Sequence, residues 1–260
     1  MLKKRLIGVV VVKGGWAVQS FGYRRYLPLG KPECLVENLD RWGADEIFVL
    51  NIDRSTDNIG PDFELLKKLG RLGLDTPLIY GGGIRSLDDG LKVIRLGADR
   101  LVVDALMHDD EKIIRSLSQK LGMQAVIGSM PVSMRDQKMD WLDYRSNTSV
   151  TVPNSIIKSL NSGIVSELLV IDWQNEGFPN SFNQNLLAGF SGLLNTPLIV
   201  FGGLSDPEQM RKLLLQPNIA GVAVGNFLSY EEHAIQNLKN QLKGMPLRLP
   251  TYQSKYRLIP

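Results

Sequence analysis

The sequence predicts an α/β protein, a (β/α)8 TIM barrel with a two-fold internal half-barrel repeat. Short apolar runs alternate with helical patterns along the chain, which is typical of strands that alternate with helices. Residues 45–50 are similar to residues 166–171, and a pair of glycines follows a strand at the same offset in each half. A doubly wound sheet is the alternative, but it does not explain why the second half repeats the first.

The first half of the chain contains four predicted strands. Residues 5–12 are apolar nearly throughout, as expected of a strand that is buried on both faces. Residues 13–31 are polar and aromatic and predict a long loop. Ser86, with Asp89 three residues later, has the pattern of a helix cap. Further strands are expected at residues 46–51, 77–79 and 100–103, and helices at residues 32–42, 61–69, 86–96 and 110–121.

The second half repeats this alternation around a polar insertion. A fifth strand begins at residues 125–127, and the insertion at residues 134–152 resembles a hairpin. Strands are then expected at residues 167–171, 198–201 and 221–224, and helices near residues 155–160 and 231–242. We expect a single domain over residues 1–260, whose proline-containing end, residues 245–260, forms a C-terminal surface arm.

Composition excludes several classes of function. The net charge of +3 is small for 260 residues and does not indicate a nucleic acid partner. The single Cys34 excludes an internal disulfide framework, and no Cys/His cluster has the spacing of metal ligands, so neither a metal nor a cofactor is expected. No apolar run is long enough to span a membrane, and the N-terminal stretch reads as a strand instead of a signal peptide. We therefore expect a cytoplasmic protein.

The two glycine turns are candidate phosphate sites. Each joins a strand to a helix start, where bare amides and missing side chains let an anion approach. A single turn of this kind needs glycine for its backbone angles whatever it binds, so only the matched pair of turns indicates phosphate binding. Both turns would lie at the C-terminal mouth of the barrel, which suits a ligand with a phosphate at each end. The candidates are Gly82, Gly83, Gly202 and Gly203, with Gly225 and Asn226 after the eighth strand.

Several motifs recur at fixed places in the predicted barrel. They are Lys4-Arg5-Leu6-Ile7, Trp42-Gly43-Ala44-Asp45-Glu46, Gly81-Gly82-Gly83-Ile84 and Leu96-Gly97-Ala98-Asp99-Arg100, with Lys13, Glu167, Gly177 and Gly202-Gly203. Together they resemble the cyclase subunit (HisF type) of imidazole glycerol phosphate synthase, over residues 5–228. The resemblance implies a barrel that receives ammonia from a HisH-like glutaminase subunit and builds an imidazole from a substrate with two phosphates. It also adds Gly177 to the phosphate-binding residues.

The sequence departs from this family at the catalytic end. Where the resemblance implies catalytic aspartates, late in the first strand and at the end of the fifth, the chain has Val11 and Met130. Neither side chain can move a proton, so efficient cyclase activity is not expected. Lys13 and Glu176 remain as polar groups at the mouth, and Asp104, which would repel a phosphate, stands in place of an asparagine. These three residues are the remaining candidates for catalysis.

Four charged residues begin predicted strands at the opposite end of the barrel. Arg5, Glu46, Arg100 and Glu167 can close into a ring of ion pairs. The alternative is that these charges only keep the strand ends soluble. An exposed ion pair contributes about 0–1 kcal/mol to stability, so loss of one member at a solvent-facing end would change stability little. The resemblance implies that this ring is an ammonia gate and that Asp99 contacts the glutaminase.

The apolar run at residues 9–12 is similar to the corresponding segment of a divergent branch of the family. This branch acts with a glutaminase-like protein and an ATP-dependent amidotransferase in surface-polysaccharide synthesis, where ammonia converts an acetamido sugar into an acetamidino sugar. The resemblance implies an ammonia-receiving subunit that acts on a phosphorylated sugar or nucleotide sugar, with the amidotransferase as a third partner. Two alternatives stay open: a cyclase subunit in histidine biosynthesis, which forms imidazole glycerol phosphate and AICAR, and a non-catalytic phosphate-binding scaffold.

The aromatic and basic loop at residues 20–28 has two interpretations. It closes on a nucleotide or sugar diphosphate by stacking and charge, or it packs two tyrosines on the rim of the barrel.

Overall fold

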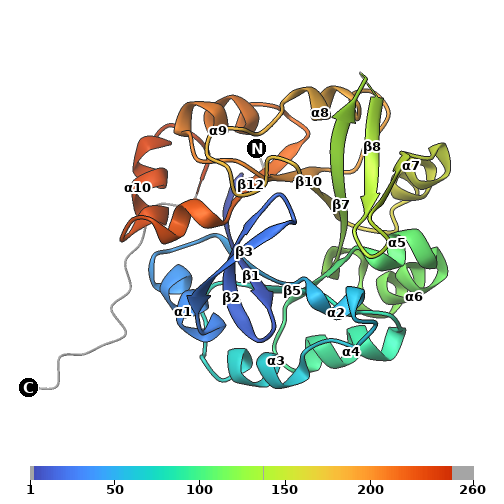
Figure 1. Cartoon of the computed structure of the whole chain (residues 1–260), viewed down its shortest axis with the longest axis horizontal. Helices are drawn as coiled ribbons and strands as arrows, with labels where there is room; N and C mark the ends of the chain where they lie inside the picture. Colours follow the sequence, from blue (N-terminus) through green and yellow to red (C-terminus); the bar gives the residue numbers. More distant parts are fainter. Residues whose placement is uncertain (1–2, 137, 248–260) are drawn as a thin grey trace, which may run out of the picture.

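The computed structural model describes residues 3–136 and 138–247. Eight parallel strands close into a barrel, because each pairs with its neighbours in chain order and β7 pairs with β10 to complete the ring. Helices surround this barrel (Figure 1). The predicted (β/α)8 barrel is confirmed. Its strands are β1 (Arg5–Lys13), β4 (Glu46–Asn51), β5 (Leu78–Gly81), β6 (Arg100–Val103), β7 (Val126–Arg135), β10 (Glu167–Asp172), β11 (Leu198–Phe201) and β12 (Ile219–Val224).

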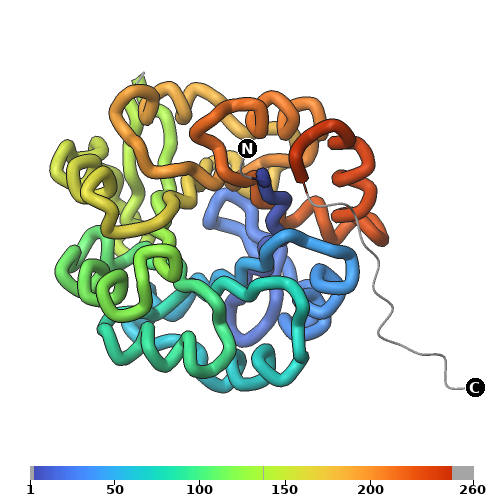
Figure 2. The backbone as a smooth tube through the Cα atoms, turned by 180° about the vertical axis from the view of Figure 1, so that it is seen from behind, coloured from blue at the N-terminus to red at the C-terminus, as the bar shows by residue number. Residues whose placement is uncertain are grey.

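The helices lie where apolar residues recur at helical spacing, and they form an outer layer, as the view from behind shows (Figure 2). The Ser86 hydroxyl accepts a hydrogen bond from the Asp89 amide at 3.1 Å, so the predicted cap is confirmed. The longer helices are α1 (Pro32–Arg41), α3 (Phe63–Gly70), α4 (Leu87–Arg95), α6 (Glu111–Leu121), α7 (Asn154–Asn161), α9 (Pro207–Leu214) and α10 (Ala234–Gln241). The sequence did not predict the short α2 (Asp53–Thr56), α5 (Ala105–Asp109) and α8 (Asn185–Ala188), or the 3-10 helices η1 (Met123–Ala125) and η2 (Asn226–Ser229).

The predicted loop at residues 13–31 is wrong, because the structure has a β-hairpin there. β2 (Trp16–Phe21) runs antiparallel to the end of β1, and β3 (Arg25–Gly30) runs antiparallel to β2. Gly14 and Gly15 form the turn with positive φ angles of 57° and 79°, which glycine adopts without steric cost. The insertion at residues 134–152 extends β7 and adds β8 (Lys138–Asp143) and β9 (Thr148–Thr151).

The glycine turns show the half-barrel repeat in three dimensions. Gly82 and Gly202 have φ angles of 124° and 109°. A Cβ atom on Gly82 would lie 2.1 Å from the carbonyl oxygen of Asn51, and one on Gly202 would lie 2.5 Å from that of Asp172. Asn51 ends β4 and Asp172 ends β10, so the same backbone packing recurs in both halves. Backbone packing alone therefore requires glycine at these two positions.

Two apolar cores lie on the two sides of the barrel wall. Alternate residues of each strand fill the barrel interior, and the others pack against the helices. Val11 belongs to the interior, whereas Met130 is fully buried in the outer core. Its neighbour Ser129 therefore presents the polar group of β7 at the mouth. The interior residues are Ile7, Val9, Val11, Val18, Phe48, Ile79, Val102, Ile127, Leu142, Leu169, Ile171, Trp173, Ile199, Phe201 and Ala223.

The predicted C-terminal arm is described only in its first residues. The carbonyl oxygen of Pro246 accepts a hydrogen bond from the Lys4 amide at 3.0 Å, and Met245 and Leu247 pack against the outer core. The rest of the arm, residues 248–260, lies outside the described residues. Within the described ranges, no helix has the length and apolar character needed to cross a membrane.

Candidate functional site

A cavity of about 320 Å³ lies at the mouth of the barrel, at the carboxyl ends of β1, β4, β5, β6 and β7. This is the end of the barrel at which (β/α)8 enzymes carry their active sites. The cavity brings together the predicted residues Lys13, Gly82 and Asp104. The sequence predicted no role for Ser129, Tyr144 and Trp173, which also line the cavity, and Tyr23 comes from the aromatic and basic segment at residues 20–28. The residues that line the cavity are Lys13, Gly22, Tyr23, Arg24, Tyr26, Leu50, Asn51, Ile52, Thr56, Gly81, Gly82, Val102, Asp104, Ser129, Leu142, Tyr144, Asn147, Ile171 and Trp173.

Asp104 is the buried carboxyl group of this cavity. It follows β6 and accepts a hydrogen bond from the Ser129 hydroxyl at 2.8 Å. Burial raises its pKa to about 7, and the negative charge of Asp143 adds to the increase, while Ser129 and Arg145 oppose it. A carboxyl group with such a pKa exchanges a proton near neutral pH, as general acid–base chemistry requires.

The β2–β3 hairpin covers the mouth. Its turn residue Tyr23 packs edge-on against Tyr144 with ring centroids 6.3 Å apart, and it lies at the same distance from Trp173. Burial raises the pKa of the Tyr23 hydroxyl well above its usual range. The Lys13 ammonium lies 4.9 Å from the centroid of the Tyr26 ring. The structure agrees with the interpretation that this segment packs tyrosines on the rim, and closure on a nucleotide or sugar diphosphate stays a prediction.

Hydrogen bonds tie the hairpin to the opposite wall. The Ser20 hydroxyl donates to the Glu176 carboxylate at 2.7 Å, and the Gly22 amide donates to the Glu176 carbonyl oxygen at 2.8 Å. Asn226 bonds the backbone of Ser20 twice, as acceptor at 3.2 Å and as donor at 2.7 Å. Burial raises the pKa of Glu176 to about 8, although the bond from Ser20 opposes the increase. Glu176 thus serves to hold the hairpin in this closed arrangement.

The two glycine turns lie in separate cavities. Gly82 lines the mouth cavity, and the Gly83 amide donates to the Ser55 hydroxyl of α2 at 3.2 Å. Gly203 lines a smaller cavity of about 220 Å³. The predicted phosphate residues Gly177, Gly203, Gly225 and Asn226 line this second cavity together with Glu176. Gly202 directly follows β11 and precedes Gly203.

A closed ring of ion pairs lies across the other end of the barrel. Arg5 Nη1 lies 3.0 Å from both carboxylate oxygens of Glu46, and Arg5 Nη2 donates to Glu167. Arg100 donates to Glu46 at 3.0 Å and to Glu167 at 2.6 Å. The Glu46 and Glu167 side chains are only 9% and 11% exposed. The expectation of a solvent-facing ring is therefore corrected, because the four side chains shield one another.

Asp99 caps the start of a neighbouring strand at this end. Its carboxylate accepts a hydrogen bond from the Leu78 amide at 2.8 Å, and the residue is exposed. Asp45 makes the equivalent bond to the Leu6 amide and also pairs with the buried Lys239 at 2.8 Å. The predicted contact residue thus has a local role in the barrel, and its exposure leaves it accessible on the N-terminal face.

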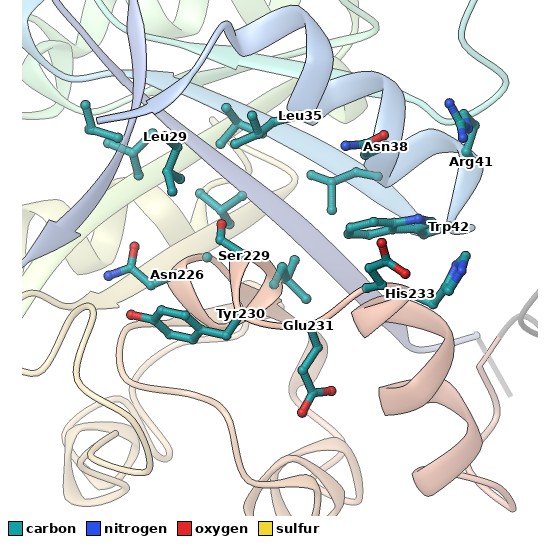
Figure 3. Close-up of a pocket in the computed structure, with 18 residues that line it drawn as sticks. Leu29, Leu35, Asn38, Arg41, Trp42, Asn226, Ser229, Tyr230, Glu231 and His233 are labelled. Carbon is teal, nitrogen blue, oxygen red and sulfur yellow. The ribbon is translucent and has the colours of Figure 1, made fainter. Parts of the chain in front are cut away.

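A larger groove of about 680 Å³ lies on the side of the barrel (Figure 3). It opens where β1 and β12 diverge, since their pairing ends at Gly8 and Val224. Valines and leucines form its floor, and Trp42 and His233 lie at one end with ring centroids 6.0 Å apart. Among the described residues, none that lines this groove has a buried side-chain polar atom without a partner. We therefore place the candidate active site at the mouth, although its cavity is smaller.

The fold is a (β/α)8 barrel with a cavity at the carboxyl ends of its strands. The family of histidine biosynthesis proteins matches residues 5–234, and the chain belongs to this family. No group of three or more His, Cys, Asp or Glu side chains in the described ranges is placed to hold a metal ion.

The relatives are imidazole glycerol phosphate synthase subunits named HisF. One from Dehalococcoides mccartyi is 28% identical over 258 residues, which are 96% of this chain and 99% of the relative. One from Natranaerobius thermophilus is 24% identical over 252 residues, 96% of this chain and all of the relative. One from Leptospira biflexa is 24% identical over 251 residues, 95% of this chain and 98% of the relative. The chain is similar to these proteins over nearly its whole length.

Proposed function

We propose that this protein is the barrel subunit of a glutamine-dependent synthase. It receives ammonia from a glutaminase at its N-terminal face and acts at the mouth on a phosphorylated sugar or nucleotide sugar. One observation carries the proposal: the ion-pair ring of Arg5, Glu46, Arg100 and Glu167 is complete, while neither place expected for a catalytic acid carries one, because Val11 lies in the barrel interior and Met130 is buried in the outer core, so that Ser129 faces the mouth from β7. The change is therefore confined to the end where the substrate binds.

The barrel interior suits the passage of neutral ammonia. An ion entering the apolar core between the ring and the mouth would lose its hydration at a large energetic cost, whereas ammonia would lose much less. A ring of paired charges closes the N-terminal end to bulk water and leaves its own polar atoms fully paired. Asp99, exposed on the same face, is a contact residue for the glutaminase in this proposal.

The mouth supplies groups for proton transfer and for anion binding. Asp104, with a pKa near neutrality, is the candidate proton donor or acceptor, and Lys13 is the candidate cation for the reacting end. Glu176 lies in the second cavity and supports the hairpin. The phosphate of the substrate would bind at the turn of Gly203, where the cavity is open to the residues after β12.

The surface-polysaccharide role, in which the product is an acetamidino sugar, is the finer form of this proposal. It follows from the apolar run around Val11, which is similar to the divergent branch of the family. An ATP-dependent amidotransferase would then be the third member of the complex. The exposed side chain of Phe178, which packs edge-on against Phe21 of the β2–β3 hairpin, is where such a protein would reach the substrate.

The histidine-pathway cyclase is the second candidate, and the names of the relatives favour it. With the apolar Val11 in the interior, and Ser129 instead of Met130 facing the mouth from β7, neither place carries an acid, so we expect turnover of the histidine-pathway intermediate to fall by about 10²–10⁴-fold for each missing group. Complementation of a cyclase-deficient histidine auxotroph tests this directly. Growth comparable to that given by a normal cyclase would contradict our proposal. A non-catalytic scaffold would bind the phosphorylated ligand and the glutaminase without transferring ammonia in a reconstituted complex.

A further inference from the structure

The lateral groove of about 680 Å³ has no role in the proposed function. Both faces of β1 reach it, because Val9 and Val11 belong to the barrel interior and Val10 belongs to the outer core. Leu29 and Leu35 extend this aliphatic floor from β3 and α1 (Figure 3). A groove with such a floor suits the apolar side chains of a chain segment that lies along it.

One rim of the groove carries negative charge. Glu231 and Glu232 are neighbours in the segment before α10, and both line the groove with exposed side chains. Charges at the rim of a binding surface select partners of the opposite sign. The occupant that suits this groove therefore combines aliphatic side chains with positive charge.

The chain itself contains a segment of this character at its C-terminal end. Residues 248–260 lie outside the described residues, and their sequence has three basic side chains, Lys255 and Arg257 among them, and no acidic one. Leu258 and Ile259 directly follow Arg257. The order of cations beside aliphatic residues matches the acidic rim beside the aliphatic floor.

The end of the described chain lies within reach of the groove. The carbonyl oxygen of Pro246 accepts a hydrogen bond from the Lys4 amide at 3.0 Å, directly before β1. A strand rises about 3.3 Å per residue, so Val9 and Val11 lie about 17 Å and about 23 Å farther along β1. Residues 248–260, thirteen in number, span up to about 43 Å when extended, which is enough to reach the groove and to cross it.

We propose that the C-terminal end of the chain docks in the lateral groove of its own barrel. Its aliphatic residues would lie on the floor, and its cations would face the acidic rim. The docked end would cover the seam between β1 and β12 and, with it, Asn226, which also bonds the hairpin at Ser20. The inference is independent of the proposed function, because it involves neither the mouth nor the ion-pair ring.

Limited proteolysis of the full chain with trypsin tests the inference, with mass spectrometry of the intact protein to follow cleavage after Lys255 and Arg257. Docking protects these sites, so variants that weaken docking should lose the end faster. Leu29→Ser makes the floor polar and should raise the rate of cleavage at least about threefold. Exposed ion pairs are weak, so the double variant Glu231→Gln, Glu232→Gln should raise it about two- to fivefold.

Two matched controls lie outside the groove. Leu215→Ser replaces a leucine with 68% of its surface exposed, and Glu208→Gln replaces an acid with 72% of its side chain exposed. Both controls should lose the end at the wild-type rate. Circular dichroism establishes that each variant is folded before the rates are compared.

The outcomes distinguish the possible occupants of the groove. Equal cleavage rates in wild type, Leu29→Ser and the double glutamine variant would overturn the inference and leave the groove to a different partner. Wild-type rates that agree at protein concentrations about a hundredfold apart, with a monomer in sedimentation, are expected for docking within one chain. Protection found only at the higher concentration, together with a dimer, would assign the groove to the end of a second copy and would overturn docking within one chain.

Discussion

Removing Glu167 should destabilise the barrel far more than removing an exposed acid. Glu167 accepts from both Arg5 and Arg100, and its side chain is 11% exposed. The substitution Glu167→Ala leaves two largely buried guanidinium groups to share Glu46. Breaking a buried ion pair costs about 3–5 kcal/mol, and partial access of water to Arg5 and Arg100 reduces this figure to about 2–4 kcal/mol. For a domain of this size that corresponds to a fall in Tm of roughly 5–15 °C.

Thermal unfolding followed by circular dichroism measures the effect. Glu64→Ala is the matched control, because Glu64 pairs with Lys67 at 2.6 Å on the surface with 76% of its side chain exposed. The control should melt at the wild-type temperature. Glu167→Gln keeps part of the hydrogen bonding and should fall between wild type and Glu167→Ala. If Glu167→Ala melts no lower than Glu64→Ala, the ion-pair ring contributes no more to stability than an exposed ion pair, and the buried-ring explanation is wrong.

Three further results are expected. Burial holds a proton on folded Asp104 up to a pKa of about 7, whereas the unfolded chain releases it near 3.8; this group should therefore lower the stability of wild type by about 1.4 kcal/mol per pH unit as pH rises between these values. In urea titrations Asp104→Asn should reduce the slope by this amount and leave the contribution of Glu176, whose pKa is raised to about 8. An unchanged slope would refute the assignment. Asn226→Ala removes both hydrogen bonds to Ser20, so trypsin should cleave the hairpin several-fold faster than in wild type. Equal cleavage rates would show that these two bonds do not hold the hairpin in place. Phosphate soaked into crystals should bind at Gly203 before Gly83, whose amide already donates to a serine of α2; ordered phosphate elsewhere and none at either turn would contradict both sites.

The sequence predicted the barrel because each strand and helix carries a local signal. Strands such as β1 are apolar on both faces, and helix starts such as Ser86 have their caps within the same few residues. The sequence did not predict β2 and β3, although Gly14 and Gly15 form a typical two-residue turn between β1 and β2.

The site was less predictable, because its parts come from segments far apart in the chain. The sequence places Asp104 at the end of a strand, but its contact with Ser129 and its electrostatic interaction with Tyr23 depend on how β6, β7 and the hairpin meet. Tyr144 lies in an insertion whose sequence has no pattern that directs it to the mouth. The four ring residues were predicted from strand starts, whereas their burial depends on their mutual contacts.

The central claim is that the charge ring passes ammonia from a glutaminase to the mouth. The direct measurement is the ratio of glutamine hydrolysed to product formed, in a complex of this protein with the glutaminase of the same organism. We expect a ratio near one for wild type and a clear excess of hydrolysis for Glu167→Ala and Arg5→Ala, because ammonia then escapes. A barrel that binds no glutaminase at micromolar concentrations, or a ratio that both substitutions leave unchanged, would contradict it.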